Sequence, residues 1–169
     1  LMHQDSIDFP DSLTYKTLIK QRKVYGGGGI MPDVFVPIDT THYSDFYRNL
    51  IRKGVLNDFT LTEVNKNREQ LLQEYPTFEE FKKSYSVSNN FYNQLLEKAK
   101  EKKLEPKNDD LERSGESIKT QLKALIARNL YGYHEFFEII NPLDPIYVKA
   151  VEIITNDALY KQLISDQTK

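Results

Sequence analysis

The sequence predicts a mainly α protein, in which a helical bundle is preceded by a short β-hairpin or strand segment. Before about residue 40 the residues favour strands and turns, whereas from Ser44 onward the apolar residues recur with the period of a helix. The 169 residues are 39% hydrophobic and 12% aromatic, which is enough apolar surface to build a core. We therefore expect a β-rich region over residues 1–40 and a helical domain over residues 41–169.

The expected β region begins with a hairpin. The alternation in Tyr15–Ile19 predicts a strand, Lys20–Arg22 a polar turn, and Lys23–Tyr25 a strand that pairs back. Four glycines at positions 26–29 follow, as a flexible segment or one with unusual φ values. Val34–Ile38 is a further strand candidate at a sheet edge or strand end, because Pro37 has no N–H to donate.

Four helices are expected between Ser44 and Lys103. Ser44 is a candidate N-cap of the first helix and Gly54 its C′ residue. Thr77 and Glu80 have the spacing of a capping box at the start of the third. The expected inward residues, in chain order, are Phe46, Tyr47, Leu50 and Ile51; Val64, Leu71, Leu72 and Tyr75 in a helix over 62–75; Phe78, Phe81 and Tyr85; and Phe91, Leu95 and Ala99 in a helix over 88–103.

A charged connector over residues 105–112 precedes the strongest predicted helix. This helix is expected to run from Ser114 or Gly115 to about Tyr131, with Ser114 as its cap and Lys123 on its solvent face. Its apolar stripe should lie at the centre of the bundle, so that Leu122→Ala would be costly. The stripe consists of Ile118, Leu122, Leu125, Ile126 and Leu130.

Two shorter helices are expected at the end of the chain. Asp144 and Pro145 predict a helix start, since proline is favoured at the first helical position. A polar tail helix is expected around residues 158–164. The face of the first of these helices that we expect to point inward consists of Ile146, Tyr147, Ala150, Val151 and Ile154.

Composition restricts the possible functions. The 23 Lys and Arg residues nearly balance the 25 Asp and Glu residues, which predicts no general attraction to nucleic acid. The chain has no cysteine, which excludes disulfides, thiol catalysis and cysteine-ligated metal sites. No apolar run approaches the ~20 residues of a membrane-spanning helix, and Leu1–Asp5 lacks the pattern of a signal peptide. The opening Leu1 leads us to expect a fragment of a longer chain.

Two motifs suggest catalytic or nucleotide chemistry, and each has a simpler interpretation. A phosphate-binding loop continues with Lys and Ser or Thr into a helix, whereas Ile30–Asp33 follows the glycines here. A Ser–Lys dyad of Ser117 or Ser114 with Lys119 would need the two groups within hydrogen-bonding reach. Residues two apart on a helix face different directions, and Ser114 is better explained as a cap.

The remaining candidates concern metals and aromatic stacking. His3, His42 and His134 stand singly, without the spacing of a helical metal pair. The acidic residues of 109–112 lack the alternating ligands of a calcium loop and are expected at the charged start of a helix. The aromatic residues are expected in the core, because stacking on single-stranded nucleic acid also needs a basic groove. We therefore expect no catalytic, cofactor-binding or metal-ligating residue, and no cofactor.

The segment Lys16–Asp33 resembles bacterial C-terminal processing (tail-specific) serine peptidases. In that family a Thr-containing strand, a turn with Arg and a Gly-Ile-x-Pro-Asp element close the protease core, downstream of the catalytic Ser–Lys dyad. Gln21 stands where the family usually has Gly, and Ile118–Arg128 is similar to the helical extension of longer members. The resemblance covers residues 13–155, and the matching residues of its first segment are Thr17, Arg22, Gly29, Ile30, Pro32 and Asp33.

The resemblance implies the non-catalytic C-terminal region of a serine endopeptidase in the bacterial cell envelope, on the periplasmic side. Such an enzyme captures unstructured protein C-termini with a PDZ-like module and hydrolyses them with a serine and a lysine, without a metal. None of these functional motifs falls within this chain, so we expect the fragment itself to be inactive. Residues 1–40 would end the peptidase core, and residues 41–169 would form a C-terminal helical domain.

The role implied for the helical domain is structural, oligomerisation or partner docking. Its expected partners are proteins: the upstream catalytic core and PDZ-like module of the same chain, an adaptor or a second copy, with no nucleic acid and no membrane-spanning segment. A free-standing helical protein-interaction adaptor is the alternative. Independent catalysis by this chain is a third interpretation, and it lacks a convergent nucleophile and base.

Overall fold

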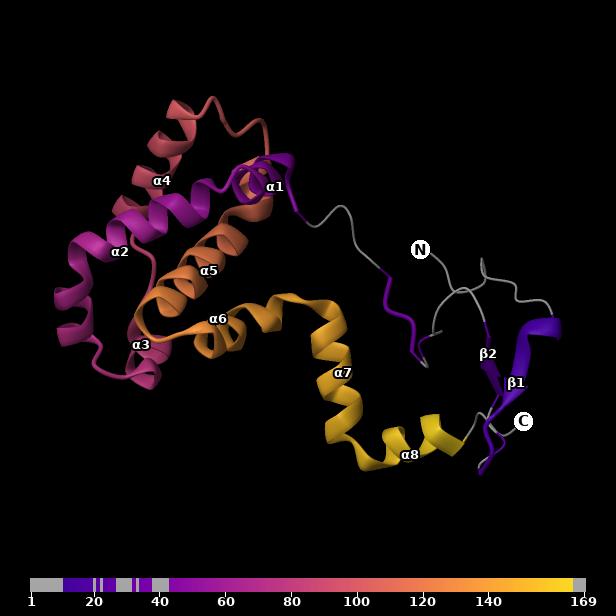
Figure 1. Cartoon of the computed structure of the whole chain (residues 1–169). Coiled ribbons are helices and arrows are strands. Elements are labelled where there is room, and N and C mark those ends of the chain that lie inside the picture. The colour runs from indigo at the N-terminus through magenta and orange to yellow at the C-terminus, as the bar shows by residue number, and fades with distance from the viewer. Residues whose placement is uncertain are drawn as a thin grey trace. The chain divides into compact units, whose positions relative to one another are not determined.

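The computed structural model describes residues 11–19, 21, 23–26, 32, 34–37 and 43–165. These residues are mainly helical, with one small antiparallel sheet (Figure 1), which confirms the expected fold class. The chain divides into two compact units, residues 40–144 and residues 1–39 together with 145–169. That residues 1–40 belong to the end of a peptidase core stays a prediction.

The expected hairpin is present but shorter than predicted. A 3-10 turn over Asp11–Leu13 leads into β1 (Thr14–Lys16), which pairs antiparallel with β2 (Lys23–Tyr25). The first strand does not reach Ile19, because the chain leaves the ladder after Lys16 and turns.

The turn of the hairpin forms without a glycine. Leu18 and Ile19 lie in it with 94% and 93% of their surface exposed, and Gln21 adopts a φ of 52°. Of the other predicted turn residues, Lys20 and Arg22 lie outside the described residues. The N–H of Gly26 closes the hairpin by donating to the carbonyl of Leu13 at 2.7 Å.

The predicted strand over Val34–Ile38 is wrong for its described part. Val34–Pro37 forms no strand, and Ile38 lies outside the described residues. Pro37 offers no N–H to a ladder, so the segment has little to gain from sheet pairing. Phe35, Val36 and Pro37 instead line a hollow of about 360 Å³ with Pro145, Val148, Lys149 and Glu152 of the same unit.

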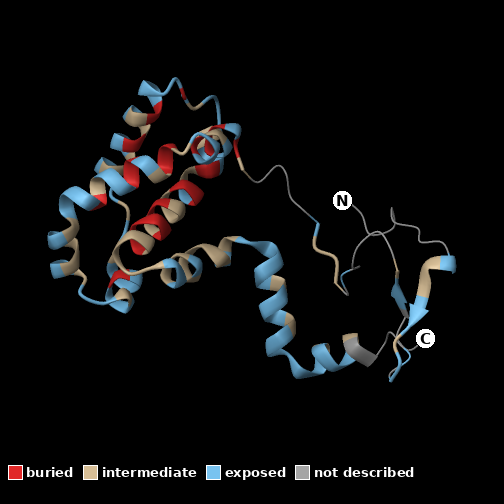
Figure 2. Ribbon diagram, viewed as in Figure 1, coloured by how far each residue is buried: buried red, intermediate tan, exposed pale blue. Residues whose placement is uncertain are grey.

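The larger unit is a helical bundle in which the buried residues gather (Figure 2). Its helices are α1 (Asp45–Arg52), α2 (Val55–Glu74), α3 (Phe78–Ser84), α4 (Asn89–Glu101), α5 (Asp110–Leu130) and α6 (Tyr133–Ile140). The longest of them, α5, packs against α1, α2 and α6. A single 3-10 turn over Asn141–Leu143 follows α6.

The predicted caps of α1 and α3 are confirmed. The hydroxyl of Ser44 accepts the N–H of Tyr47 at the start of α1, and Thr77 and Glu80 form the capping box of α3. Gly54, with a φ of 69°, follows the C-cap of α1 and is also the N-cap of α2. Because this one left-handed residue joins the two helices, α2 starts at Val55 and not at the predicted residue 62.

The prediction that Ser114 caps α5 is wrong. The helix begins at Asp110, so the acidic cluster lies at a helix start as predicted. Ser114 lies inside the helix, fully buried, and its hydroxyl accepts the backbone N–H of Ser44 at 2.8 Å. This bond satisfies a buried donor and ties the start of α1 to α5.

The apolar stripe of α5 lies in the core, as predicted. Ile118 and Leu122 are fully buried, Leu125 and Ile126 are 4% and 1% exposed, and Leu130 is half-buried. Two clusters meet along the stripe. The first contains Phe46, Tyr47, Leu50, Val55, Leu56, Phe59, Leu95, Ala99, Leu104, Ile118, Leu122 and Leu125; the second contains Val64, Phe81, Ile126 and Ala127.

The predicted solvent position of Lys123 is wrong. Its Nζ donates to the carbonyls of Lys82 and Tyr85, each at 2.7 Å, and lies 5.8 Å from the centre of the Phe81 ring. These carbonyls end α3, where a cation is favoured by the helix dipole. Partial burial lowers the pKa of Lys123.

Helix α6 was not predicted from the sequence. It follows Gly132, whose φ of 145° breaks the chain direction after α5. Arg128 of α5 reaches α6 and lies 5.7 and 5.8 Å from the ring centres of Tyr133 and Phe136. The spacing of Phe136 and Ile139 was the available sequence signal.

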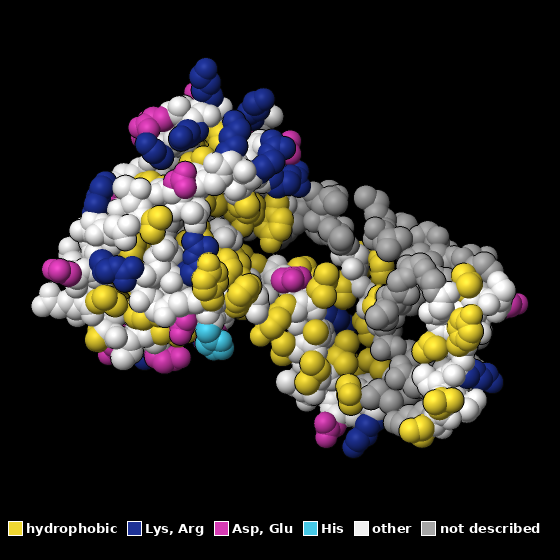
Figure 3. All heavy atoms as spheres, viewed as in Figure 1, with side chains coloured by type: hydrophobic (Ala, Val, Ile, Leu, Met, Phe, Trp, Pro, Cys, Tyr) yellow, Lys and Arg dark blue, Asp and Glu magenta, His cyan; other side chains and the backbone are white. Residues whose placement is uncertain are grey.

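The last two helices belong to the smaller unit. The first, α7 (Pro145–Thr155), begins with proline as predicted, and the tail helix α8 (Asp157–Ser165) is confirmed. The prediction that α7 points its apolar face inward is wrong, since Ile146, Tyr147, Ala150, Val151 and Ile154 are all exposed. Figure 3 shows hydrophobic side chains on the surface over this helix. Periodicity reveals an amphipathic face but not what covers it.

Candidate binding groove

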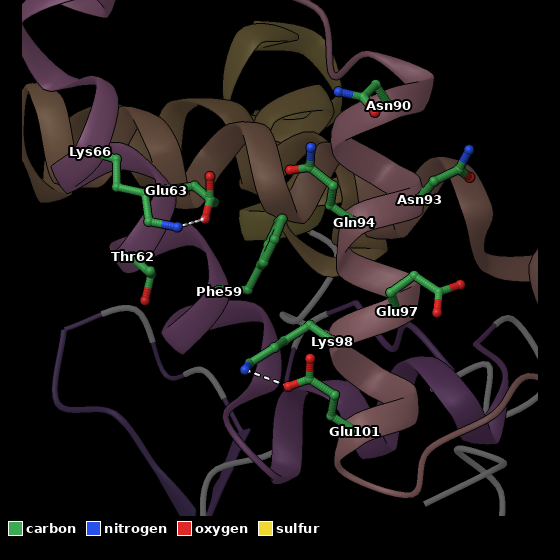
Figure 4. A pocket seen from close by; sticks show the side chains of 10 residues that line it. All are labelled: Phe59, Thr62, Glu63, Lys66, Asn90, Asn93, Gln94, Glu97, Lys98 and Glu101. Atoms are coloured by element: carbon green, nitrogen blue, oxygen red, sulfur yellow. Dashed lines mark hydrogen bonds and ion pairs between the residues drawn. The ribbon is translucent and has the colours of Figure 1, made fainter.

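A groove of about 700 Å³ lies between α2 and α4 of the bundle. Figure 4 shows side chains from both helices pointing into it, and we call it the α2–α4 groove. Its residues from α2 are Phe59, Thr62, Glu63 and Lys66; those from α4 are Asn90, Asn93, Gln94, Glu97, Lys98 and Glu101.

The α2 wall is one face of a regular helix. Thr62, Glu63 and Lys66 follow Phe59 at intervals of three, four and seven residues, which places all four side chains on the same side. The Nζ of Lys66 pairs with Glu63 at 2.7 Å. Thr62 donates its hydroxyl to the carbonyl of Asp58 at 2.8 Å, and its oxygen keeps the capacity to accept a further bond.

The floor of the groove is aromatic and rigid. Phe59 is only 6% exposed and belongs to the first core cluster. Its ring centre lies 4.9 Å from that of Phe91, at an interplanar angle of 57°. Figure 4 shows Phe59 between the two rows of polar side chains, so a ligand there would meet the small exposed part of a fixed aromatic ring.

The α4 wall carries carboxamides at one end and charges at the other. Its start is fixed by Ser88, whose hydroxyl accepts the N–H of Phe91. At the charged end Lys98 pairs with Glu101 at 2.6 Å, and Glu97 pairs at 2.7 Å with Lys100, which lies outside the groove. The bond to Glu97 raises the pKa of Lys100.

These ion pairs are open to exchange with a ligand. The side chains of Glu97 and Glu101 are 71% and 63% exposed, and exposed pairs are typically worth only about 0–1 kcal/mol. Within the described residues, the carboxamides of Asn90, Asn93 and Gln94 make no hydrogen bond to the protein. The groove therefore presents donors, acceptors and charges over an apolar floor, which suits the binding of a polar chain molecule.

The residues considered for a Ser–Lys dyad serve other contacts. Ser114 is engaged with Ser44, and Ser117 is buried. The Nζ of Lys119 pairs with Glu116 at 2.9 Å and lies 5.7 Å from the centre of the Tyr92 ring. Among the described residues, no hydrogen bond joins Lys119 to either serine.

The other sequence candidates are dispersed. His134 is 87% exposed and lies 3.8 Å from Glu138, and the described part of the chain contains no cluster of His, Asp and Glu that could hold a metal ion. Asp110 accepts the N–H of Lys107, and Asp109 lies 3.8 Å from Arg113. Candidates outside the described residues are His3, His42, Arg22, Asp33, Ile30 and Gly27–Gly29. In the described residues no helix has the length and apolar character needed to cross a bilayer.

Sequence reasoning missed the α2–α4 groove. The only signal was the repetition of carboxamides at positions 90, 93 and 94, opposite the apolar face of the same helix. Exposed Asn and Gln on a helix are common, so the pattern gains meaning only when α2 is seen to lie alongside.

Comparison with known proteins places the bundle in a family. The model of a family of unknown function (DUF8443) matches residues 46–132, just over half of the chain. The chain belongs to the DUF8443 family. The DUF8443 match extends from α1 to Gly132, two residues past the end of α5, and so contains both walls of the α2–α4 groove. No curated protein and no solved structure matches the chain.

Proposed function

We propose that this chain is a non-catalytic protein-docking region, and that it uses the α2–α4 groove as its contact surface. The observation that carries the proposal is the row of exposed carboxamides and weakly paired charges over the floor formed by Phe59. Neutral hydrogen-bonding groups beside an aromatic surface are typical of surfaces that recognise polypeptide.

The architecture supports binding without much rearrangement. The floor residue Phe59 belongs to the same core cluster as Leu95 of α4 and Leu122 of α5. Both walls are therefore fixed to a common core, and little conformational entropy would be lost when a partner binds.

We further propose that the parent protein is a C-terminal processing serine peptidase of the bacterial cell envelope. The support is the resemblance of Lys16–Asp33, which contributes the last residue of β1 and all of β2 to the hairpin, although Thr17 itself lies after β1. A hairpin of two short strands is marginal by itself, so these strands would gain most from joining a larger sheet. The free-standing adaptor remains the second candidate, favoured by the bundle's own closed core.

Lysine footprinting tests the docking proposal. The chain is treated with an acetylating reagent with and without a permanently unfolded protein, reduced and carboxymethylated α-lactalbumin. We expect slower acetylation of Lys66 and Lys98, which line the groove, and no change at Lys83, which is exposed on α3. Equal acetylation of all three lysines with and without the unfolded protein would refute docking at the groove.

The parent protein is tested separately. Reading the coding sequence upstream of Leu1 should reveal a PDZ-like module and a catalytic serine and lysine. Their absence from the complete reading frame would favour the adaptor. We also expect no cleavage products of the unfolded protein in the mixture used for footprinting. Cleavage that occurs with the wild-type chain and disappears in Ser117→Ala would contradict the non-catalytic assignment.

A further inference from the structure

We propose that the α2–α4 groove binds a short polypeptide segment in extended conformation, one with an apolar residue and, two positions away, a lysine or arginine. This inference rests on the proposed docking function and deepens it by naming the ligand. Three properties of the groove carry it: its length, the spacing of its carboxamides and the order of its apolar and acidic parts.

The length of the groove suits an extended chain. The α4 wall runs from Asn90 to Glu101, and a rise of 1.5 Å per residue makes it about 16 Å long. An extended polypeptide advances about 3.3 Å per residue, so about five residues fill the groove.

The carboxamides match the repeat of a peptide backbone. Asn90 and Gln94 are one helical turn apart, which is about 6 Å along the axis. In an extended chain, groups on the same side recur every second residue, about 6.6 Å apart. Each carboxamide has both a donor and an acceptor, and can therefore meet the N–H and C=O of one residue. Side-chain amides can thus recognise the backbone irrespective of its sequence.

The floor and the acidic end add selectivity. Figure 4 shows Asn90 and Glu101 at opposite ends of the groove, with Phe59 between them. An apolar side chain over Phe59 covers the exposed part of that ring. The side chain two residues along lies on the same face of the peptide, displaced toward the charged end.

Charge favours a basic residue at that end. The groove is lined by three carboxylates and two ammonium groups, and Lys66 and Lys98 are already paired with Glu63 and Glu101. A ligand lysine or arginine can replace a weakly bound partner of Glu101 or Glu97 without burying an unpaired charge. An anionic ligand, nucleic acid included, would instead meet one more carboxylate than ammonium group among the residues that line the groove.

Fluorescence anisotropy on the full chain tests the inference with labelled peptides. The probe is Ser-Gly-Leu-Gly-Lys-Gly-Ser; its comparisons carry N-methyl groups on alternate amides, or Glu in place of Lys. We expect binding of the probe, with Gln94→Met lowering affinity about tenfold through the loss of a carboxamide's hydrogen bonds. The N-methylated peptide and the Glu peptide should bind the wild-type chain no more tightly than the probe binds Gln94→Met. Gln70→Met, the same change on an exposed part of α2 outside the groove, is the control and should bind as the wild type does.

The outcomes separate this inference from the docking proposal. Equal affinity for the N-methylated peptide, or no effect of Gln94→Met at unchanged thermal stability, overturns extended-backbone recognition. A preference for the Glu peptide overturns the basic-residue requirement. If footprinting still protects Lys66 and Lys98 with the unfolded protein while no peptide binds, docking stands and this inference fails. If the unfolded protein protects neither lysine and the peptide does not bind, both the docking proposal and this inference fail.

Discussion

Leu122 of α5 provides the sharpest test of how the bundle is held together. Its side chain is fully buried, and it shares the first core cluster with Phe59, Leu95 and Ile118. Helices from several parts of the chain converge there, so the surroundings have little freedom to collapse into a cavity. Leu122→Ala should therefore cost about 3 to 5 kcal/mol, the upper part of the range for such truncations. Since small domains are stable by only ~5–15 kcal/mol, the loss should be plain in a urea melt.

The matched control for this substitution is Gln70→Ala. Gln70 is exposed on α2, four residues before its last residue Glu74, and in both variants an alanine replaces a longer side chain within a helix. We expect a change below about 0.5 kcal/mol for the control. If Leu122→Ala proves as mild as Gln70→Ala at an unchanged slope with denaturant, then the stripe of α5 is not the core, and the packing described above is incorrect.

Three further predictions concern single side chains of the two units. Lys123→Ala should cost about 1–2 kcal/mol in urea melts, because two carbonyls at the end of α3 lose their donor; an effect no larger than that of Lys83→Ala would contradict this. Ile154→Ala should change stability by less than about 0.5 kcal/mol, because Ile154 is 68% exposed; a loss as large as that of a core residue would show that α7 is covered. Burial raises the pKa of Tyr47 and of Tyr85 to about 12, from an ordinary 10.0. The contribution of these two tyrosines to the free energy of unfolding is complete below pH 10 and is lost between pH 10 and 12. In that range the unfolded chain has released protons that the folded chain keeps. Melts in that window should show falling stability, and replacing both tyrosines with Phe should flatten the fall; an unchanged slope would refute the assignment.

The elements that the sequence predicted well are those determined locally. The caps at Ser44 and Thr77 need only a side chain three residues from an N–H, and the stripe of α5 follows from helical periodicity. The C′ position of Gly54 was predicted too, but not that α2 would start immediately after it. A helix boundary thus depends on the conformation of the segment that follows it.

The errors concern properties set by tertiary contacts. Serine is a residue type favoured at helix caps, which is why Ser114 was predicted as one. Only the position of α1 shows that Ser114 lies inside a helix and accepts the N–H of Ser44. Lys123 lies one residue from a core position, and only the end of α3 explains why it turns toward two carbonyls. The groove itself depends on α2 and α4 lying side by side, which no local pattern contains.

Binding of an extended polypeptide in the α2–α4 groove is tested most directly by an NMR titration of the full isotope-labelled chain. The titrant is the peptide Ser-Gly-Leu-Gly-Lys-Gly-Ser with a spin label at one end. We predict broadening of the side-chain amide signals of Asn90, Asn93 and Gln94 that is reversed when the label is reduced, and none at Gln70. Broadening that is absent, or that affects Gln70 as strongly as Gln94, would contradict binding of an extended peptide in the groove.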